Sequence, residues 1–492
     1  WAALRVARRW LPERVALPAL EWRHLLWLAL PLPALLYLAA GERDSRYAMA
    51  RFTAPGLALQ GLAPATDFDR DGYSWFTPQR DAAPFDAARH PFVLDIPGNG
   101  IDEDGYGGDF RIQGGRAAFP APAIPRKKHV VLVVLESTRG DAIGRKVDGR
   151  PLTPVLNALA LEGSYAREAY SHVGFTTESL KSLFGGTLSP RPGAPSLFRD
   201  FKANGYRIGV FSGQPESFGD ISETVGMKAS ADVFVDAETL KAERAFGFAA
   251  KGSLLIDGKK LLRAFDRAFG QAEGWARPTF AYVNFQEAHF PYAHPGTPRI
   301  LAGEPIPRGE ISPANRAWVE RTYWNAIAYD DRLVGALIAR LKRLGVWEDT
   351  LLVVTADHGE SLFDDAFLGH GHVINRQQTQ IPLILSERGS AIDQPVGLAD
   401  FRALILARLG AKVPRRTGPV FQHVSRLAAP AAIGLVAKGG VWTTFQLETE
   451  EVAFGESGRR LRYRDLKPGS AEKARADSVI DEWTRQRWLA RE

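Results

Sequence analysis

Carboxylate and imidazole side chains gather in a few short polar motifs of the chain. They are Glu136, His289, Asp357, His358, His370 and His372. Asp357 and His358 are adjacent, and the pair His370 and His372 follows twelve and fourteen residues after His358. Carboxylates and imidazoles together suit Zn²⁺ or Mn²⁺ and leave coordination positions open for the oxygens of a substrate. We therefore expect a catalytic metal centre.

A hydroxyl group is the expected nucleophile beside this metal centre, because the chain contains no cysteine. The segment Ser171–Gly186 resembles a loop that runs into a helix, with Thr176 and Thr177 at the helix start. Amide groups at a helix N-terminus stabilise a bound phosphoryl group. A metal can also lower the pKa of a hydroxyl enough to make it an attacking group. The same Thr-Thr-Glu-Ser sequence is an ordinary helix cap, so the motif alone fits both interpretations.

The elements that would position these residues alternate between apolar strands and helices. The strand candidates are 129–135, 206–212, 279–285, 351–355 and 381–385, and the helix candidates are 152–162 and 318–344. Strands that alternate with helices over about 300 residues predict an α/β fold with a doubly wound, mainly parallel sheet. Ligands of such a sheet bind at the carboxyl ends of its strands. Glu136, Asp357 and His289 all follow predicted strands.

Four motifs together resemble the alkaline phosphatase and sulfatase superfamily. They are VVLVVLE at 130–136, TTESLKSLFGG at 176–186, AHFP at 288–291 and TADHGESL at 355–362. Within this superfamily, the sequence resembles the branch of membrane-anchored transferases that contains lipoteichoic acid synthase and the lipid A phosphoethanolamine transferases. The resemblance covers residues 129–390.

The resemblance implies roles for the candidate residues. Glu136, Asp357 and His358 would bind the catalytic metal together with a threonine nucleophile. The spacing between the nucleophile and the residues that follow it in the family favours Thr176. Counting positions from Gly174 would instead select Thr177. Two further histidines of the family, which contact the substrate or a second metal, match His289 and His370, and His372 is an additional candidate for this role.

A transferase is the function that the resemblance favours. We expect the protein to move a phosphoglycerol or phosphoethanolamine head group from a phospholipid of the membrane to a glycan or lipid acceptor, through a phospho-threonine intermediate. A true sulfatase is disfavoured because Leu180 stands where the sulfatase pattern has Arg, and Glu136-Ser137 replaces two adjacent Asp residues. A sulfatase-like ester hydrolase, a phosphodiesterase and a non-catalytic lipid-binding regulator remain alternatives.

A membrane anchor is expected near the N-terminus. Leu25–Ala40 carries no charge over sixteen residues, and five arginines lie in the stretch 1–23 that precedes it. A full span needs about 20 apolar residues, so a buried core helix is the alternative. The positive-inside rule places the following chain outside the cytoplasm. We therefore expect a protein of the bacterial inner membrane with its catalytic domain on the periplasmic side.

Two acidic clusters near the N-terminal end of the chain resemble the calcium-binding Asp-rich repeat of some bacterial envelope proteins. The expected ligands are Asp67, Asp69, Asp71, Asp86, Asp95, Asn99, Asp102 and Asp104. Carboxylates at alternate positions followed by glycine wrap a hard cation with oxygen ligands. The middle of the repeat is degraded here, and an acidic solvated loop is the alternative. A bound Ca²⁺ would be structural.

The net charge and the order of segments along the chain indicate possible partners and domain limits. The net charge of +6 is small for 492 residues, and it gives no indication of a nucleic-acid partner. We expect a membrane anchor at 1–45, an Asp/Gly/Pro-rich linker at 46–128, the catalytic domain at 129–430 and a small α+β part at 431–492. The oligomeric state leaves no mark in the sequence.

Overall fold

The computed structural model describes residues 31–51, 53–111, 119–246, 255–389, 391–414 and 416–491. The chain divides into two compact units. The first unit contains the chain up to Val93 together with Asp102–Gly105. The second unit contains Leu94–Ile101 and the chain from Tyr106 onward. This division does not test the predicted domain limits.

Three helices begin the described part of the first unit. They are α3 (Pro31–Gly41), α4 (Arg43–Arg51) and α5 (Thr53–Thr66). Ala40, Leu59 and Phe76 form a small buried core, and the ring of Trp75 stacks on that of Tyr37 at 4.8 Å. The segment from 67 to 93 is a succession of turns that follows α5.

The predicted membrane helix Leu25–Ala40 lies partly outside the described residues. Residues 25–30 precede the described part of the chain, whereas 31–40 belong to α3. Within the described residues, none of the helices combines the length and the apolar character that crossing a membrane requires. The membrane anchor therefore stays a prediction.

An eight-stranded sheet with the order β12-β4-β11-β8-β1-β7-β5-β6 forms the centre of the second unit. Its strands are β1 (His129–Leu135), β4 (Ser164–Tyr170), β5 (Arg207–Ser212), β6 (Val233–Val235), β7 (Thr279–Phe285), β8 (Thr350–Thr355), β11 (Gln380–Leu385) and β12 (Val396–Gly397). β11 runs antiparallel to both of its neighbours, and the other neighbouring strands pair in parallel. The expected α/β fold is present, with a mixed and mainly parallel sheet.

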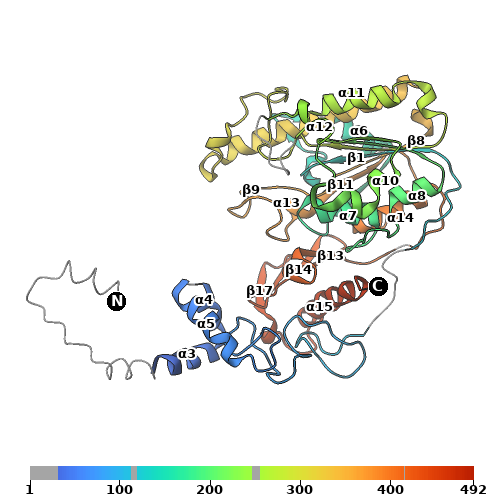
Figure 1. Ribbon diagram of the computed structural model, residues 1–492. Coiled ribbons are helices and arrows are strands. Elements are labelled where there is room, and N and C mark those ends of the chain that lie inside the picture. The colour runs from blue at the N-terminus through green and yellow to red at the C-terminus, as the bar shows by residue number, and fades with distance from the viewer. Residues whose placement is uncertain are drawn as a thin grey trace, which may run out of the picture. The chain divides into compact units, whose positions relative to one another are not determined.

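Helices cover both faces of this sheet, because both faces of its central strands are apolar. Successive side chains of a strand point to opposite faces, and those of β1 divide between two buried clusters. One face packs against α7 (Thr176–Gly185), α8 (Leu197–Ala203), α9 (Ile221–Val225), α10 (Met227–Ser230) and α14 (Phe401–Arg408). The other packs against α6 (Pro154–Glu162), α11 (Gly258–Phe269) and α12 (Arg316–Arg343). Figure 1 shows these two helical layers on either side of the strands.

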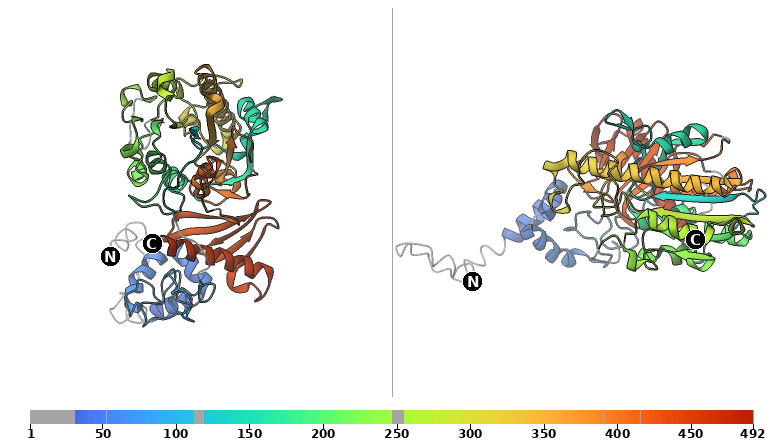
Figure 2. Two further views of the ribbon diagram at one scale, coloured as in Figure 1. Left: turned by 90° about the vertical axis from the view of Figure 1, so that its right-hand side faces the viewer. Right: turned by 90° about the horizontal axis from the view of Figure 1, so that it is seen from above.

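A second, antiparallel sheet follows the main one along the chain. Its strands, in spatial and chain order, are β13 (Val420–Arg426), β14 (Ala429–Ala437), β15 (Val441–Gln446), β16 (Glu451–Phe454) and β17 (Arg459–Arg462). Helix α15 (Ala471–Leu489) lies along this sheet, as Figure 2 shows in red. Val479, Ile480 and Trp483 are its buried residues against the strands. The small α+β part expected at 431–492 is therefore a five-stranded sheet with one helix, and the sheet begins before residue 431.

Two short hairpins and one short helix complete the described elements. β2 (Lys146–Val147) pairs with β3 (Arg150–Pro151), and β9 (Ser361–Leu362) pairs with β10 (Leu368–Gly369). Helix α13 (Arg376–Thr379) leads into β11. The β9–β10 hairpin connects the motif after β8 to the segment that carries His370 and His372, so it belongs to the surroundings of the candidate site.

Candidate active site

The carboxyl ends of β1 and β8 bring the expected metal ligands together. The two strands are parallel neighbours, with Val134 of β1 opposite Thr355 of β8. Glu136 follows the end of β1, and Asp357 and His358 follow the end of β8. Their ligand atoms lie within 4.8 Å of one another, and all three residues are buried.

Thr176 completes this group from the first turn of α7. Its Oγ1 lies 3.2 Å from Oε1 of Glu136 and 3.2 Å from Nε2 of His358. The residue before the helix is Phe175, whose side chain forms no capping hydrogen bond. The first amides of α7 are therefore left for another acceptor, since the first four N–H groups of a helix have no partner within it. The Thr176 side chain is not used as a helix cap.

Thr177 points to a different neighbour. A Cβ added at Gly219 would lie 2.4 Å from Cγ2 of Thr177, so this side chain packs closely against the Gly219 backbone. Of the two threonines that the sequence offered, Thr176 is the one whose hydroxyl contacts the candidate metal ligands.

The hydrogen bonds of Asp357 and His358 fit a bound divalent cation. Oδ1 of Asp357 accepts hydrogen bonds from the amides of Ser137 and His358, whereas its buried Oδ2 has no hydrogen-bond partner. Nδ1 of His358 lies 2.9 Å from the carbonyl oxygen of Gly359. Nδ1 therefore carries the ring proton, and the lone pair of Nε2 faces Thr176 and Asp357. A hydrogen bond from one ring nitrogen to a backbone carbonyl, with the other nitrogen left for the metal, is typical of metal-binding histidines.

Charge within the site also favours a cation. Burial and the charge of Glu136 raise the pKa of Asp357 well above its usual range. Burial lowers the pKa of His358 to about 4. Burial would raise the pKa of Glu136, but the charges of His358, His289 and His370 outweigh it and lower that pKa to about 2. In this state, little positive charge lies beside the two adjacent buried carboxylates of Glu136 and Asp357. A divalent cation would compensate the negative charge of both.

Gln286 supports Glu136 from the end of β7. Its Nε2 donates hydrogen bonds to Oε2 of Glu136 and to Oδ1 of Asn284, both at 3.1 Å. Glu136 is thus held on one oxygen by Gln286, while the other oxygen faces Thr176. The sequence analysis did not identify this role of Gln286.

His370 approaches the metal ligands from the segment after β10. Its ring centre lies 4.2 Å from that of His358, and its Nδ1 lies 2.6 Å from Oε2 of Glu360. The other oxygen of Glu360 accepts a hydrogen bond from the hydroxyl of Tyr292 at 2.5 Å. Burial lowers the pKa of His370, but the charge of Glu360 outweighs it, so that pKa is raised overall. His358, Glu360 and His370 also lie close enough to form a second metal-binding group.

The other two candidate histidines differ in position. His289 is half-buried, its charge lowers the pKa of Glu136, and its Nδ1 lies 2.8 Å from the carbonyl oxygen of Phe290. His289 therefore borders the site, with Nε2 left for a substrate. His372 is exposed and its ring packs on Phe367 at 4.3 Å. The structure does not bring His372 into any of the metal-binding groups of the described residues.

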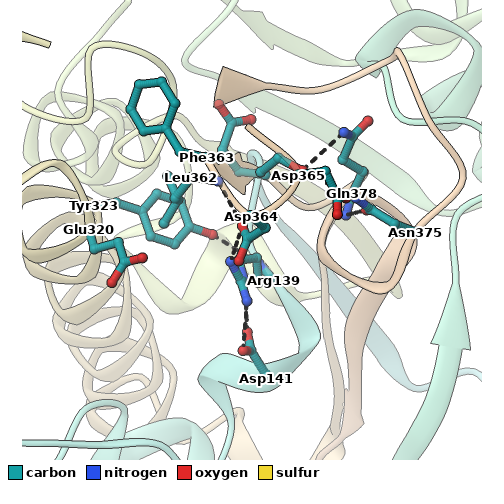
Figure 3. Close-up of polar contacts among 12 residues, drawn as sticks. Arg139, Asp141, Glu320, Tyr323, Leu362, Phe363, Asp364, Asp365, Asn375 and Gln378 are labelled. Carbon is teal, nitrogen blue, oxygen red and sulfur yellow. Dashed lines mark hydrogen bonds and ion pairs between the residues drawn. The ribbon is translucent and has the colours of Figure 1, made fainter. Parts of the chain in front are cut away.

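Arg139 ties the segment after β1 to the β9–β10 hairpin (Figure 3). Its guanidinium donates to both oxygens of Asp141, at 3.0 and 2.9 Å, and to Oδ2 of Asp364 at 3.1 Å. The same oxygen of Asp364 accepts a hydrogen bond from the amide of Leu362 at 2.8 Å. The hydroxyl of Tyr323 accepts a hydrogen bond from the amide of Arg139. This network fixes the hairpin that leads to His370, and the sequence gave no signal for it.

The first acidic cluster converges as expected in the smaller unit, but with a different fourth member. Oxygens of Asp67, Asp69 and Asp71 lie within 4.8 Å of one another. Each of these residues has a buried carboxylate oxygen without a hydrogen-bond partner, and so does Asp81. Burial and the charges of Asp71 and Asp69 raise the pKa of Asp81, so its carboxylate lies near theirs. Asp86 is exposed and accepts a hydrogen bond from the amide of Ala88, so its role as a ligand stays a prediction.

The second acidic cluster stays a prediction. Asp95 and Asn99 belong to the larger compact unit, whereas Asp102 and Asp104 belong to the smaller one. Within their own segments, Asn99 accepts a hydrogen bond from the amide of Ile101, and Asp102 accepts one from the amide of Gly105, both at 2.8 Å.

The model of the sulfatase family matches residues 128–411, which is more than half of the chain. The chain therefore belongs to the sulfatase family, and its predicted membership of the alkaline phosphatase and sulfatase superfamily of enzymes is confirmed. This superfamily is metal-dependent, in agreement with the metal-binding groups at the ends of the strands.

Two curated relatives are similar over part of the sequence. The multifunctional alkaline phosphatase superfamily protein PehA of Trinickia caryophylli is 32% identical over 121 residues, which cover 23% of this chain and 22% of PehA. The lipoteichoic acid synthase-like protein YvgJ of Bacillus subtilis is 22% identical over 303 residues, which cover 56% of this chain and 45% of YvgJ. The chain thus spans less than half the length of either relative.

A solved structure shares the fold. The lipoteichoic acid synthase LtaP from Listeria monocytogenes is similar with a TM-score of 0.54 and 15% sequence identity, over 77% of this chain and 96% of that chain. At this identity the similarity concerns the α/β fold alone, and the fold prediction is confirmed at that level.

Proposed function

We propose that this protein transfers a phosphoglycerol or phosphoethanolamine head group from a phospholipid to a glycan or lipid acceptor of the bacterial envelope. The observation that carries the proposal is the hydroxyl of Thr176, 3.2 Å from both Glu136 and His358 at the start of α7. Sulfatases mature a cysteine or serine to formylglycine, and threonine does not fit that chemistry. The similarity to a lipoteichoic acid synthase-like protein also supports a transferase.

Glu136, Asp357 and His358 would hold the catalytic cation, for which Zn²⁺ and Mn²⁺ are the candidates. Such a cation lowers the pKa of the Thr176 hydroxyl and stabilises charge on phosphoryl oxygens. The unpartnered Oδ2 of Asp357 and the lone pair of His358 Nε2 support this assignment, because both face the same point as Thr176. The first amides of α7 would bind the non-bridging phosphoryl oxygens.

In the first half of the reaction, the hydroxyl of Thr176 releases its proton to solvent water, and its oxygen forms a bond to the phosphorus of the donor lipid. The bond between phosphorus and the diacylglycerol oxygen breaks, and the leaving oxygen takes a proton from His370. Glu360 supports His370 in this role by holding Nδ1, which leaves Nε2 to donate. The products are diacylglycerol and Thr176 that carries the phospho-alcohol group.

In the second half, a hydroxyl or amine of the acceptor gives its proton to His370 and bonds to phosphorus. The bond between phosphorus and the Thr176 oxygen breaks, and this oxygen takes a proton from solvent water, which restores the hydroxyl. His289, with Nδ1 held by the carbonyl of Phe290, would orient the head group through Nε2. Water in place of the acceptor would make the same site a phosphodiesterase, and the local similarity to PehA keeps that second function in consideration.

A membrane location fits a lipid donor. The predicted anchor Leu25–Ala40 would keep the catalytic domain beside its substrate on the periplasmic side of the inner membrane. We also propose that Asp67, Asp69, Asp71 and Asp81 bind a structural Ca²⁺ in the smaller unit. Their four unpartnered carboxylate oxygens support this proposal, because Ca²⁺ prefers oxygen ligands from several carboxylates.

The proposed function is tested by replacing each threonine in turn. Purified protein is assayed with phosphatidylglycerol and with phosphatidylethanolamine in detergent, and released diacylglycerol is measured. Thr176→Ala should lower turnover by several orders of magnitude, whereas Thr177→Ala, the matched control, should retain most of it. If Thr177→Ala is inactive and Thr176→Ala is active, the nucleophile is the neighbouring threonine. If both variants turn over like the unaltered protein, the covalent mechanism is wrong.

A further inference from the structure

A separate group of metal-binding side chains lies between the end of β7 and the helices α11 and α12. Asp257, Glu287 and His294 each offer one ligand atom, and these atoms lie within 4.8 Å of one another. Glu287 and His294 are buried, and Asp257 is half-buried at the start of α11. The proposed transfer reaction uses none of these three residues.

The contacts of the three residues are short. Nε2 of His294 lies 2.6 Å from Oε2 of Glu287, and Oε1 of Glu287 accepts a hydrogen bond from the amide of Gly258 at 2.7 Å. Oδ1 of Asp257 accepts hydrogen bonds from the hydroxyl of Tyr329 and from the amide of Lys259. These bonds orient the carboxylates toward one another from three different elements of the fold.

Glycines leave room for this convergence. A Cβ at Gly296 would lie 2.5 Å from Oδ2 of Asp257 and 3.2 Å from Nδ1 of His294. A Cβ at Gly258 would lie 3.1 Å from Oε1 of Glu287. A side chain at Gly296 would therefore displace the carboxylate of Asp257, and one at Gly258 would first meet Leu333, at 2.3 Å.

Asp330 on α12 is an independent sign that a ligand is missing from this region. It is fully buried, and neither of its carboxylate oxygens has a hydrogen-bond partner. After burial itself, the charge of Glu287 has the largest effect on Asp330 and raises its pKa well above the usual range. An unpartnered buried carboxylate costs free energy unless a proton or a cation accompanies it.

The protein itself supplies little positive charge here. Throughout the described part of the chain, no arginine or lysine forms an ion pair with Asp257, Glu287 or Asp330. Lys259 lies over the ring of Tyr329, at 5.0 Å from its centre, instead. The amide of Gly296 donates to Nδ1 of His294, so a neutral imidazole keeps its proton on Nε2, toward Glu287. A cation can replace that proton.

We propose that Asp257, Glu287 and His294 bind a second divalent cation of the zinc or manganese type. One imidazole and several carboxylates form a donor set for these metals. His294 also lines a cavity of about 230 Å³. The bound ion would join both ends of the segment Glu287–His294 to α11 and α12. His289 lies within this segment, so the ion would hold that histidine in place.

Metal content of the full chain tests this proposal without reference to the transfer reaction. The protein is stripped with chelator, reloaded with Zn²⁺ alone, dialysed and measured by mass spectrometry of the metal. His294→Gln and Asp257→Asn should each bind about one zinc ion per chain less than the unaltered protein. Asp266→Asn, a change elsewhere on α11, is the matched control and should bind as much as the unaltered protein. Equal zinc content in all four proteins would overturn the proposal.

A measurement on the unaltered protein keeps the test valid if the variants do not fold. Crystals soaked in Zn²⁺ are measured at the zinc absorption edge. The proposal requires an anomalous peak between Asp257, Glu287 and His294, separate from any peak at Thr176. A peak at Thr176 alone would contradict the second site and leave the proposed function intact. A peak at the second site alone would contradict the catalytic assignment and leave this inference intact.

Discussion

Gln286 donates a hydrogen bond to Glu136 at 3.1 Å, on the carboxylate oxygen opposite to the one that faces Thr176. The glutamine amide therefore sets the rotation of the carboxylate that would bind the metal. Such partners of metal ligands orient the ligand and contribute to metal affinity.

Replacing Gln286 should weaken the metal centre. Gln286→Ala leaves Oε2 of Glu136 without this donor, so we expect about a 10- to 100-fold loss of metal affinity or of kcat/KM. Zinc titration of the apoprotein measures the first quantity and diacylglycerol release the second. Gln214→Ala is the matched control, since Gln214 is a nearly buried amide whose Nε2 has no partner. Equal losses in both variants would mean that Gln286 acts only through packing.

Arg139 should position the hairpin that leads to His370. Arg139→Met leaves Asp141 and Asp364 without their shared guanidinium, and we expect the free energy of unfolding to fall by about 2–4 kcal/mol. Arg316 also contacts Asp364, but its side chain is 42% exposed, so Arg316→Met should cost less than Arg139→Met. Urea unfolding measures both values. Hydrogen exchange should also rise in Ser361–Gly369 for the Arg139 variant, and unchanged exchange there would remove the positioning role.

Glu216 should make the fold less stable as the pH rises. Burial raises the pKa of this fully buried residue from 4.5 to about 7. The folded protein thus holds the proton more tightly than the unfolded chain does. The resulting stability is complete below about pH 4.5 and is lost as the pH rises through 7, up to about 3 kcal/mol in total.

Glu216→Gln should remove the part of this dependence that Glu216 contributes, whereas Asp330 and Asp357, whose pKa values burial also raises, keep theirs. Asp331 contributes in the same direction, because burial raises its pKa to about 6, so a smaller slope should remain in the variant. Thermal unfolding between pH 5 and pH 8 makes the comparison. A slope as steep in Glu216→Gln as in the unaltered protein would show that another group titrates.

Calcium removal should loosen the smaller unit and spare catalysis. Without the cation, the carboxylates of Asp67, Asp69, Asp71 and Asp81 repel one another, so chelation should speed protease cleavage of the segment 60–110. Asp81→Asn should show fast cleavage even with calcium present. Asp86→Asn is the control, because Asp86 is exposed and lies outside the group. Identical cleavage with and without chelator would exclude a calcium site.

Much of the fold followed from apolar periodicity, because the central strands are buried on both faces. The run HVVLVVL marked β1 with its observed limits. β4 was missed, since Ser164, Arg167 and Glu168 interrupt its apolar pattern. The direction of β11 was also beyond the sequence, because a continuous apolar strand carries no mark of parallel or antiparallel pairing.

The ligands of the candidate site were predictable because each directly follows a strand or begins a helix. His372 follows a glycine, as His370 does, so the sequence does not separate the two histidines. In the structure, His372 lies exposed beside Phe367. The groups around Arg139 and around Glu287 left no sequence signal. Members of each group come from segments far apart in the chain, and the packing of α11 against the sheet brings Asp257 close to Glu287 and His294.

The most direct test of the central proposal is the mass of the protein during turnover. Unaltered protein is incubated with phosphatidylglycerol or phosphatidylethanolamine, quenched in acid and digested, and the peptide that contains Thr176 is analysed by fragmentation mass spectrometry. We expect this peptide to gain a phosphoglycerol or phosphoethanolamine group on Thr176, and Thr176→Ala to lack any such adduct. Turnover of the lipid with no modified threonine at any time would contradict the covalent mechanism.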